Sequence, residues 1–406
     1  MINSFGSLQG LVVLDLTNFL AGPYATLIMG DLGANIIKIE SMDGDDSRKV
    51  PPHSYKKEGA YHLATNRNKK SIVLNLKTSK GWEIFLEMVK KADIVIDNFR
   101  VGVIERLQID YEHLKEVNPR IICCSISGFG KNGPYKDRPA YDMIVQALSG
   151  GMSMTGEEGG RPVRSGIPIG DLCAGMFAVI AILSCVHERS ISGKGQEIDV
   201  SMLDSQISML CYQAIYYLLA GVVAGPQGAG HVSIPTYRSF PTKNGIDILI
   251  TANTEKMWQS LCSVLDMEEL INDPLFETNK DRLQNKEKLI PLLEERFSYK
   301  TCEEWMELLV KGGVPAAPVN TIDKALADPQ VLARNMVVDV EHSLGGKIKL
   351  LGNPIKLKRT PAETFISPPL HGQHTHEVLR DFLKLDDHKI IALEEEGVVK
   401  SGSITT

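Results

Sequence analysis

An alternation of strand and helix patterns in the first 130 residues constrains the fold more than any other feature. The run "GLVVLDL" (10–16) predicts a buried strand, "PYATLIMGDLG" after it predicts a short helix closed by Gly33, and "ANIIKIE" predicts a second strand. A helix between consecutive strands implies a right-handed crossover and parallel pairing. Further strands are predicted at 71–76, 93–99 and 120–127. The sequence therefore predicts an α/β fold with an open parallel sheet.

The patterning changes near residue 225. Residues 172–189 and 202–221 are apolar almost all round, which is typical of helices buried in a core or an interface. Beyond them, "YRSFPTKNGIDILITA" predicts a hairpin turned at Asn244-Gly245, followed by amphipathic helices at 255–265 and 302–310. We therefore expect a smaller α+β domain at 225–330, and we expect the irregular stretch 41–68 to be a surface excursion.

The composition excludes several classes of protein. A net charge of −6 over 406 residues gives no general attraction to nucleic acid or to anionic lipid. Seven scattered cysteines without a Cys-x-x-Cys pair favour reduced thiols and argue against structural zinc. Residues 1–10 lack a signal-peptide pattern, and no uninterrupted apolar run reaches the roughly 18 residues that a membrane span needs. We expect a cytoplasmic protein that binds neither nucleic acid nor membrane.

One carboxylate stands out because of its neighbours. In "GIPIGDLCAG" (166–175), Asp171 lies between small residues and immediately before a long apolar run. One hypothesis is that Asp171 caps a helix beginning at Leu172 by accepting a hydrogen bond from an amide of the first turn. The other is that it is a nucleophile, since an ordinary carboxylate is already ionised at neutral pH and needs no general base. The glycines around it would let a bulky thioester approach the backbone.

Three other motifs carry weaker signals. "GFGKNG" (128–133) matches a dinucleotide fingerprint but does not open a helix, so we expect only a glycine-rich turn. "HGQHTH" (371–376) lacks a carboxylate or thiol in register, which argues against a metal site and favours a loop entering a helix capped by Thr375. Basic residues gather next to predicted strands, where a phosphate could bind them; these are Arg67, Lys69, Lys70, Arg100 and Arg106.

Several segments together resemble the family III CoA-transferases, the group that includes formyl-CoA transferase, carnitine CoA-transferase and α-methylacyl-CoA racemase. The matching pieces run in order through the whole chain: "VVLDLTNFLAGPYATLIMGDLGANIIKIE", "NRNKKSIVLNLK", "DIVIDNFRVGVIERL", "NPRIICCSISGFGKNGPYKDRPAYD", "SGIPIGDLCAG", "GKGQEIDVSMLD", "GVPAAPVN" and "PPLHGQHT". The resemblance implies a Rossmann-like large domain formed by residues 1–224 together with a returning segment 331–406, and a homodimer of interlocked subunits.

The resemblance also implies roles for individual residues. Asp171 occupies the position of the family's nucleophile, which forms a mixed anhydride and then an aspartyl-CoA thioester. Coenzyme A is then a substrate, delivered by an acyl-CoA donor and passed to a small carboxylic acid, and no permanent cofactor is needed. The positions that match the CoA site are Lys69, Lys70, Asn98, Phe99, Arg106 and Tyr141.

Two departures from the family pattern narrow the expected activity. Leu20 stands where the formyl-CoA enzyme has a glutamine, and "GPQGAGHVSIPTYRSF" replaces its run of glycines, so formyl-CoA:oxalate exchange is disfavoured. Tyr141 stands where the racemases have a histidine, and a phenol with a pKa near 10 is a poor base at neutral pH.

The sequence looks most like the branch that acts on dicarboxylates, including the glutarate enzymes. We therefore expect transfer of CoA from a donor such as succinyl-CoA to a dicarboxylic acid. Candidate contacts with the acceptor, besides Leu20, are Arg164, His231 and Arg238. Two alternatives remain open at this point: a 2-methylacyl-CoA racemase, which would exchange the α-proton, and a CoA-binding protein without catalytic activity.

Overall fold

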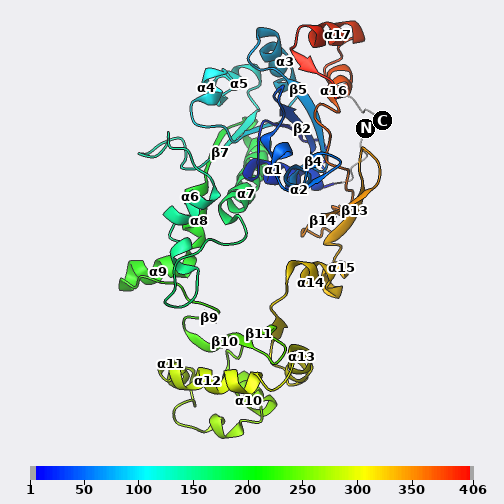
Figure 1. The fold of residues 1–406 in the computed structure, drawn as a ribbon. Helices are drawn as coiled ribbons and strands as arrows, with labels where there is room; N and C mark the ends of the chain where they lie inside the picture. The colour runs from blue at the N-terminus through cyan, green and yellow to red at the C-terminus, as the bar shows by residue number, and fades with distance from the viewer. Residues whose placement is uncertain (1–5, 403–406) are drawn as a thin grey trace. The chain divides into compact units, whose positions relative to one another are not determined.

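A computed structural model describes residues 6–402 (Figure 1). Residues 1–5 and 403–406, which the predicted domain ranges include, lie outside the described part. The chain divides into a larger unit, formed by Met1–Gly151, Ser165–Ala214 and Pro329–Thr406, and a smaller unit, formed by Met152–Arg164 and Ile215–Asp328. Compared with the expected range of 225–330, the smaller unit begins earlier and also includes the segment Met152–Arg164.

The larger unit is built on a seven-stranded sheet. Its strand order is β15-β5-β2-β1-β6-β7-β8, and all neighbours are parallel except β15 and β5. Apart from the antiparallel edge strand, this is the Rossmann order, in which the first three strands are added toward one edge of the sheet and the next three toward the other. The strands are β1 (Val12–Asp15), β2 (Asn35–Glu40), β5 (Lys69–Leu74), β6 (Ile94–Asp97), β7 (Ile122–Ser127), β8 (Glu197–Ser201) and β15 (Val399–Lys400).

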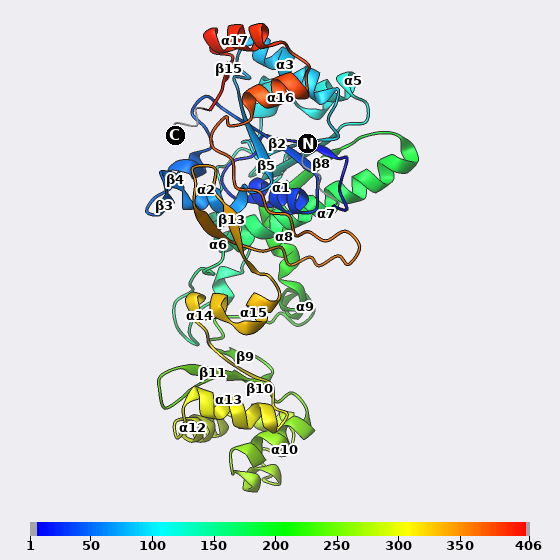
Figure 2. The same ribbon diagram turned by 90° about the vertical axis from the view of Figure 1, so that its right-hand side faces the viewer.

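Helices cover both faces of this sheet (Figures 1 and 2). One core lies between the sheet and the helices α3 (Ser79–Val89), α5 (Tyr111–Val117), α16 (Thr375–Asp381) and α17 (Asp387–Glu395). The other lies against α1 (Ala21–Asp31) and α7 (Ile169–Ser192). Adjacent strand residues alternate between the two cores, as Cys123 and Cys124 do in β7. The predicted βαβ pattern is confirmed.

The helix α7 combines length with apolar composition. Within residues 6–402 it is the one helix that is long and apolar enough to cross a membrane. The sequence-based expectation was that no apolar segment would reach the length of a membrane span. One side of it packs on the sheet and on α1, where the missing side chain of Gly175 admits the backbone carbonyl of Ala21. The opposite side exposes Met176, Phe177 and Ile180.

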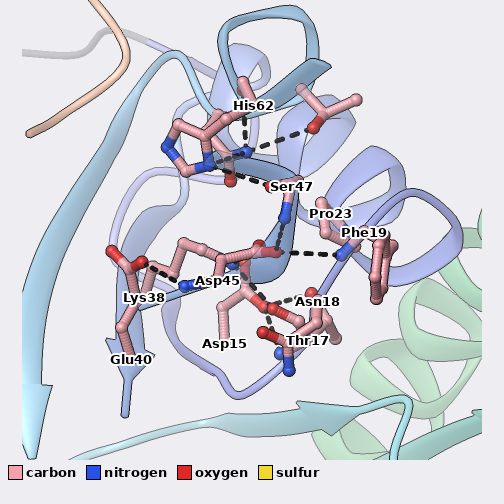
Figure 3. A network of polar contacts seen from close by, with 12 residues as sticks. Asp15, Thr17, Asn18, Phe19, Pro23, Lys38, Glu40, Asp45, Ser47 and His62 are labelled. Atoms are coloured by element: carbon pink, nitrogen blue, oxygen red, sulfur yellow. Dashed lines mark hydrogen bonds and ion pairs between the residues drawn. The ribbon is translucent and has the colours of Figure 1, made fainter. Parts of the chain in front are cut away.

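The expectation of a surface excursion at 41–68 holds for residues 51–57, most of which are exposed, but is wrong for Asp45 and for most of 62–67, which are buried. Three cations and three anions from this stretch and the neighbouring strands form a network of side chains with little exposure, of which Figure 3 shows Asp15, Lys38, Glu40 and Asp45. The ammonium of Lys38 lies 2.9 Å from Asp45, and Arg48 binds Glu40 through two hydrogen bonds of 2.7 and 2.8 Å. The ammonium of Lys69 lies 3.2 Å from Asp15. Buried charges need such partners, which is why this polar stretch is fixed against the sheet.

The remaining elements of the larger unit are short. They are a 3-10 turn (Asp46–Lys49), β3 (Ser54–Tyr55), β4 (Glu58–Gly59), α2 (Ala60–Thr65), α4 (Val103–Arg106), α6 (Asp142–Leu148), α8 (Met202–Met209), α15 (Pro329–Ala333), β13 (Val337–Glu341) and β14 (Lys347–Leu351). Helix α16 begins at Thr375, so His374 and not Thr375 occupies its N-cap position. The Thr375 hydroxyl instead accepts a hydrogen bond from the backbone of Val73 and donates one to Lys400.

The smaller unit has a four-stranded sheet covered on one face by helices. Its strand order is β12-β11-β10-β9, and the predicted hairpin turned at Asn244-Gly245 joins β10 to β11. Gly245 has a φ of 74°, which suits glycine. The elements are β9 (Gly230–His231), β10 (Ile234–Pro241), β11 (Asp247–Ile250), β12 (Ala316–Pro318), α10 (Glu255–Val264), α11 (Asn279–Gln284), α12 (Lys286–Phe297), α13 (Cys302–Lys311) and α14 (Ile322–Ala327). Helix α9 (Cys211–Ala220), which contains no buried residue, spans the junction of the two units.

A buried carboxyl group at the end of β6 leads to a stability prediction. Asp97 accepts hydrogen bonds from Ser125 and from the amide of Phe99, and burial raises its pKa to about 6. Because the folded pKa lies above the unfolded value, this group favours folding at low pH, and its contribution is lost as the pH rises from about 4 to 6. We expect Asp97→Asn to increase the free energy of unfolding at pH 7 by about 2 kcal/mol. The gain should vanish near pH 4, and urea titrations at both pH values would check it.

Candidate active site

Asp171 lies in the first turn of α7 at the third helical position, because the helix begins at Ile169. The prediction that Asp171 caps a helix starting at Leu172 is therefore wrong. The N-cap residue is Pro168, whose side chain has no hydrogen-bond acceptor. Asp171 is half-buried and directly precedes the part of the helix that packs on the sheet.

The helix end is capped by a residue from another helix. The carboxylate of Asp142, in the first turn of α6, accepts a hydrogen bond of 2.8 Å from the amide of Gly170 and one of 2.6 Å from the side chain of Gln146. A Cβ atom on Gly170 would lie 3.0 Å from that carboxylate and 2.9 Å from the amide of Gln206. The glycine before Asp171 therefore makes room for a second carboxylate.

This second carboxylate changes the charge state of the first. Burial, followed by the negative charge of Asp142, raises the pKa of Asp171 to about 7. The sequence-based assumption that Asp171 is already ionised at neutral pH needs correction: close to pH 7 it is divided between its two forms. When ionised, a carboxylate of raised pKa is a stronger nucleophile than an ordinary one, because it is less stabilised by its surroundings.

Tyr61, in α2, belongs to the same neighbourhood and was not anticipated from the sequence. Burial together with the charges of Asp171, Asp142 and Asp45 raises its pKa to about 12. Its hydroxyl therefore stays protonated at neutral pH and can donate a hydrogen bond. Nothing in the local sequence around Tyr61 marks it, whereas Asp142 directly follows the Tyr141 that the family resemblance had singled out.

The loop after β1 contacts Tyr141 through the side chain of Phe19. The rings of Phe19 and Tyr141 meet edge to face with their centroids 6.4 Å apart, and about two thirds of the Tyr141 side chain is exposed. Phe19 has a φ of 62°, a left-handed conformation that costs a bulky residue about 1–3 kcal/mol. Leu20 follows at the N-cap of α1 and is half-buried. The residue that contacts Tyr141 is therefore Phe19, which directly precedes Leu20 in the chain.

Two residues expected to line the CoA site have other contacts. Asn98 accepts a hydrogen bond of 2.8 Å from the amide of Asn18 and donates one of 2.8 Å to the carbonyl of the same residue. Phe99 packs its ring on the core beneath α3 and α5. A direct role of either side chain in binding CoA stays a prediction.

The basic residues differ sharply in accessibility. Lys69 is completely buried, and its ammonium contacts Asp15, Asn66 and the carbonyl of Pro23. Burial lowers its pKa to about 8, while Lys69 and Lys38 hold the pKa of Asp15 at about 2. Its burial and its internal partners argue against the phosphate-binding role predicted for Lys69.

Of the other basic residues that could bind a phosphate, Arg67 is buried and paired with Asp31, whereas Lys70 and Arg106 are nearer the surface. Lys70 is half-buried and lies 2.7 Å from Glu377 of α16. Arg106 is exposed at the end of α4, which begins after Gly102 with a φ of 86°. For both residues, contact with a phosphate of CoA stays a prediction.

The remaining candidates belong to the smaller unit. Arg238, in β10, faces the helices of that unit, where its guanidinium lies 4.0 Å from Glu294 and over the ring of Phe240. This internal packing argues against a contact with an acceptor acid. His231 stacks on Tyr237 with ring centroids 5.6 Å apart, and Arg164 is exposed at the end of Met152–Arg164.

The three histidines of "HGQHTH" contact different partners and do not form a cluster. His371 contacts the carbonyl of Ser41, His374 accepts from the amide of Ser71, and His376 lies 3.4 Å from Asp387. Across residues 6–402 no three His, Cys, Asp or Glu side chains gather in a way that could hold a metal ion.

The site thus combines a half-buried carboxyl of raised pKa, a second carboxylate on the helix end and the protonated phenol of Tyr61. A carboxylate in such surroundings is suited to attack an electrophilic carbonyl, because acylation removes its unfavourable charge. It is equally suited to hold a proton near neutral pH.

Comparison with known proteins distinguishes between these chemistries. The family described as CoA-transferase family III matches residues 8–375. The chain is 39% identical to the succinyl-CoA:glutarate CoA-transferase of Homo sapiens over 98% of its length and 91% of the relative. It is 40% identical to the acetyl-CoA:oxalate CoA-transferase of Acetobacter aceti, over 87% and 89% of the two chains.

A third relative and a solved structure agree with these. The succinyl-CoA:mesaconate CoA-transferase of Haloarcula hispanica is 35% identical, over 92% of this chain and 96% of the relative. The crystal structure of a CAIB/BAIF family protein from Brucella suis superposes with a TM-score of 0.85 at 36% identity, covering 94% of this chain and all of that one. The Rossmann-like sheet, the position of Asp171 and these matches together establish that the chain belongs to CoA-transferase family III.

Proposed function

We propose that this protein transfers CoA from succinyl-CoA to a small dicarboxylic acid, with Asp171 as the covalent nucleophile. The observation that carries the proposal is the setting of Asp171: half-buried, with a pKa raised to about 7 beside a second carboxylate. The relatives support the substrate class, since their names specify transfer from succinyl-CoA to glutarate or mesaconate. CoA thioesters are the substrates, and the reaction needs no resident cofactor.

The first half-reaction loads CoA onto the protein. The ionised Asp171 carboxylate attacks the donor thioester carbonyl, forming a mixed anhydride and expelling CoA thiolate. The thiolate then attacks the aspartyl carbonyl, forming an aspartyl-CoA thioester and releasing the donor acid, which keeps one of the original Asp171 oxygens. Tyr61 is a candidate to donate a hydrogen bond to the oxyanion that develops in each step.

The second half-reaction runs the same chemistry in reverse. The acceptor carboxylate attacks the aspartyl thioester, giving a second anhydride and thiolate. The thiolate attacks the acyl carbonyl of the acceptor, which leaves as a new acyl-CoA. Asp171 is regenerated with one oxygen from the acceptor. No activation is lost if water is kept from the intermediates.

The charged groups of the substrates need basic partners. We propose Arg106 and Lys70 for the phosphates of CoA, because their side chains are at least partly exposed whereas Lys69 is not. Arg164 and His231 remain candidates for the second carboxylate of the acceptor.

A substrate panel tests the proposed function. Purified protein would be incubated with succinyl-CoA and, separately, glutarate, mesaconate, oxalate or a monocarboxylic acid, and new acyl-CoAs would be identified by mass spectrometry. We expect a dicarboxylyl-CoA product and no deuterium uptake at the α-carbon of a 2-methylacyl-CoA. Proton exchange without an acceptor acid would indicate a racemase, and binding of CoA without either reaction would indicate a non-catalytic role.

We further propose that two copies form an interlocked homodimer. The exposed apolar residues of α7 and the tyrosines and leucines of α9 form apolar surface that a second copy would cover. Native mass spectrometry should give twice the mass of the chain, and a monomer at micromolar concentration would contradict this. The free thiols are consistent with the predicted cytoplasmic compartment.

A further inference from the structure

In the loop that joins β1 to α1, the three consecutive residues Thr17, Asn18 and Phe19 are held by side chains from other parts of the chain. Thr17 donates from its amide and its hydroxyl to Asp15, and its carbonyl accepts from Lys38 at 2.6 Å. The side chain of Asn98 accepts a hydrogen bond from the backbone amide of Asn18 and donates one to the carbonyl of the same residue. The amide of Phe19 donates to Asp45 at 3.2 Å, and the carbonyl of Leu20 accepts from Tyr24 of the following helix.

Asp45 is itself fixed. Its carboxylate accepts the amide of Ser47 at 2.9 Å and pairs with Lys38, while its own amide donates to Glu40 (Figure 3). Figure 3 shows Asp45 between the ammonium of Lys38 and the backbone of Phe19. The acceptor for Phe19 is therefore not a mobile surface carboxylate but part of the buried ion network.

Asn98 lies at the point where the strand order of the large sheet reverses. It directly follows β6, and the loop that it binds follows β1. Between β1 and β6 the strand order reverses, and in sheets of this type ligands bind outside the carboxyl ends of the strands at that point. The two hydrogen bonds of Asn98 thus join the two loops that follow β1 and β6 at this point of the sheet.

The consequence of these restraints is the left-handed conformation of Phe19. A phenylalanine does not adopt a φ of 62° unless its surroundings require it. In this conformation the ring stands edge-on to Tyr141, whose neighbour Asp142 caps the helix that carries Asp171. Asn98 and Asp45 are therefore linked through Phe19, Tyr141 and Asp142 to the end of the helix that carries the proposed nucleophile.

We propose that Asn98 is a positioning residue, which together with Asp45 holds Phe19 against Tyr141 as a wall that keeps water from the acylated Asp171. The proposal rests on the proposed function, because it concerns the partition between transfer and hydrolysis. It differs from a direct role in CoA binding, since an oxygen and an amide hydrogen of Asn98 are already engaged by the protein backbone.

The test compares hydrolysis with transfer in variants of the full-length protein. We expect Asn98→Ala to raise the ratio of succinyl-CoA hydrolysis to transfer by about tenfold, because the wall loses its support. Phe19→Ala should do the same. The double variant should show no further increase, since both changes remove the same wall. Asn98→Asp, which keeps the acceptor for Asn18, should show a smaller increase.

Asn118→Ala is a matched control. Asn118 also donates two backbone hydrogen bonds, to the carbonyls of Val89 and Ala92, but it lies after α5 away from Asp171. Removing it should lower stability without altering the hydrolysis ratio. An Asn98→Ala variant that raises KM for succinyl-CoA at an unchanged ratio, or whose effect multiplies with that of Phe19→Ala, would overturn the proposal in favour of direct CoA binding. If the wild-type protein transfers no CoA, the proposed function fails instead.

Discussion

Asp171→Ala and Asp171→Asn are expected to lower the rate of CoA transfer by at least about 10³-fold, because each removes the oxygen that attacks the donor thioester. The asparagine variant is the more informative of the two. It keeps the size and most of the polarity of the side chain, so a loss of activity cannot be assigned to a collapsed pocket. Initial rates of new acyl-CoA formation from succinyl-CoA and glutarate would measure the effect.

Asp204→Ala is the matched control for these variants. Asp204 occupies the third position of α8, as Asp171 does in α7, but its side chain is exposed. We expect this variant to retain wild-type rates. Because Asp171 is poorly stabilised in its ionised form, neither Asp171 variant should unfold at lower urea concentration than the wild type at neutral pH. Substantial transfer by correctly folded Asp171→Asn protein would exclude the nucleophile.

The pH dependence of the reaction is the second large expected effect. Only the ionised form of Asp171 attacks, and its pKa in the free protein lies at about 7. The value of kcat/KM for the donor should therefore fall about tenfold for each pH unit below 7 and level off above it. A carboxylate of ordinary pKa would give a flat profile down to about pH 5.

Asp142→Asn should shift this profile to lower pH. The substitution removes the negative charge beside Asp171 while the side-chain oxygen can still accept from Gly170, so the pKa of Asp171 should fall by about one unit. Burial, which is the larger cause, remains and keeps the pKa above its ordinary value. Asp142→Glu retains the charge and serves as the control, with an expected midpoint close to that of the wild type. An unchanged midpoint in Asp142→Asn would contradict the electrostatic role of Asp142.

The framework of the large sheet could be predicted from the sequence because its strands are nearly continuous apolar runs. Residues such as Val13 and Leu14 alternate between two covered faces of the sheet. The stretch 41–68 could not be predicted in the same way. Its polar residues resemble those of a surface loop, and the partners that bury them, such as Lys38 for Asp45, are known only once the chain has folded.

The candidate site, too, could be predicted only in part from the sequence. Asp171 was identified because its glycine neighbours and the family resemblance both pointed to it. Asp142 and Tyr61 were not, because their role depends on helices that approach α7 in three dimensions. Lys69 illustrates the opposite error. A lysine in a run of basic residues resembles a phosphate ligand. Side chains alternate between the two faces of β5, however, and that of Lys69 lies on the side of the buried ion network.

The central claim is that the oxygens of one side chain exchange with those of the substrates. Turnover of succinyl-CoA with an acceptor acid labelled with ¹⁸O in the receiving carboxyl group tests it most directly. Cleavage after Arg164 and Arg189 releases residues 165–189, which contain Asp171, for mass spectrometry. The account predicts that this peptide gains ¹⁸O during turnover and that Asp171→Asn protein does not. New acyl-CoA accumulating while the peptide remains unlabelled would contradict it.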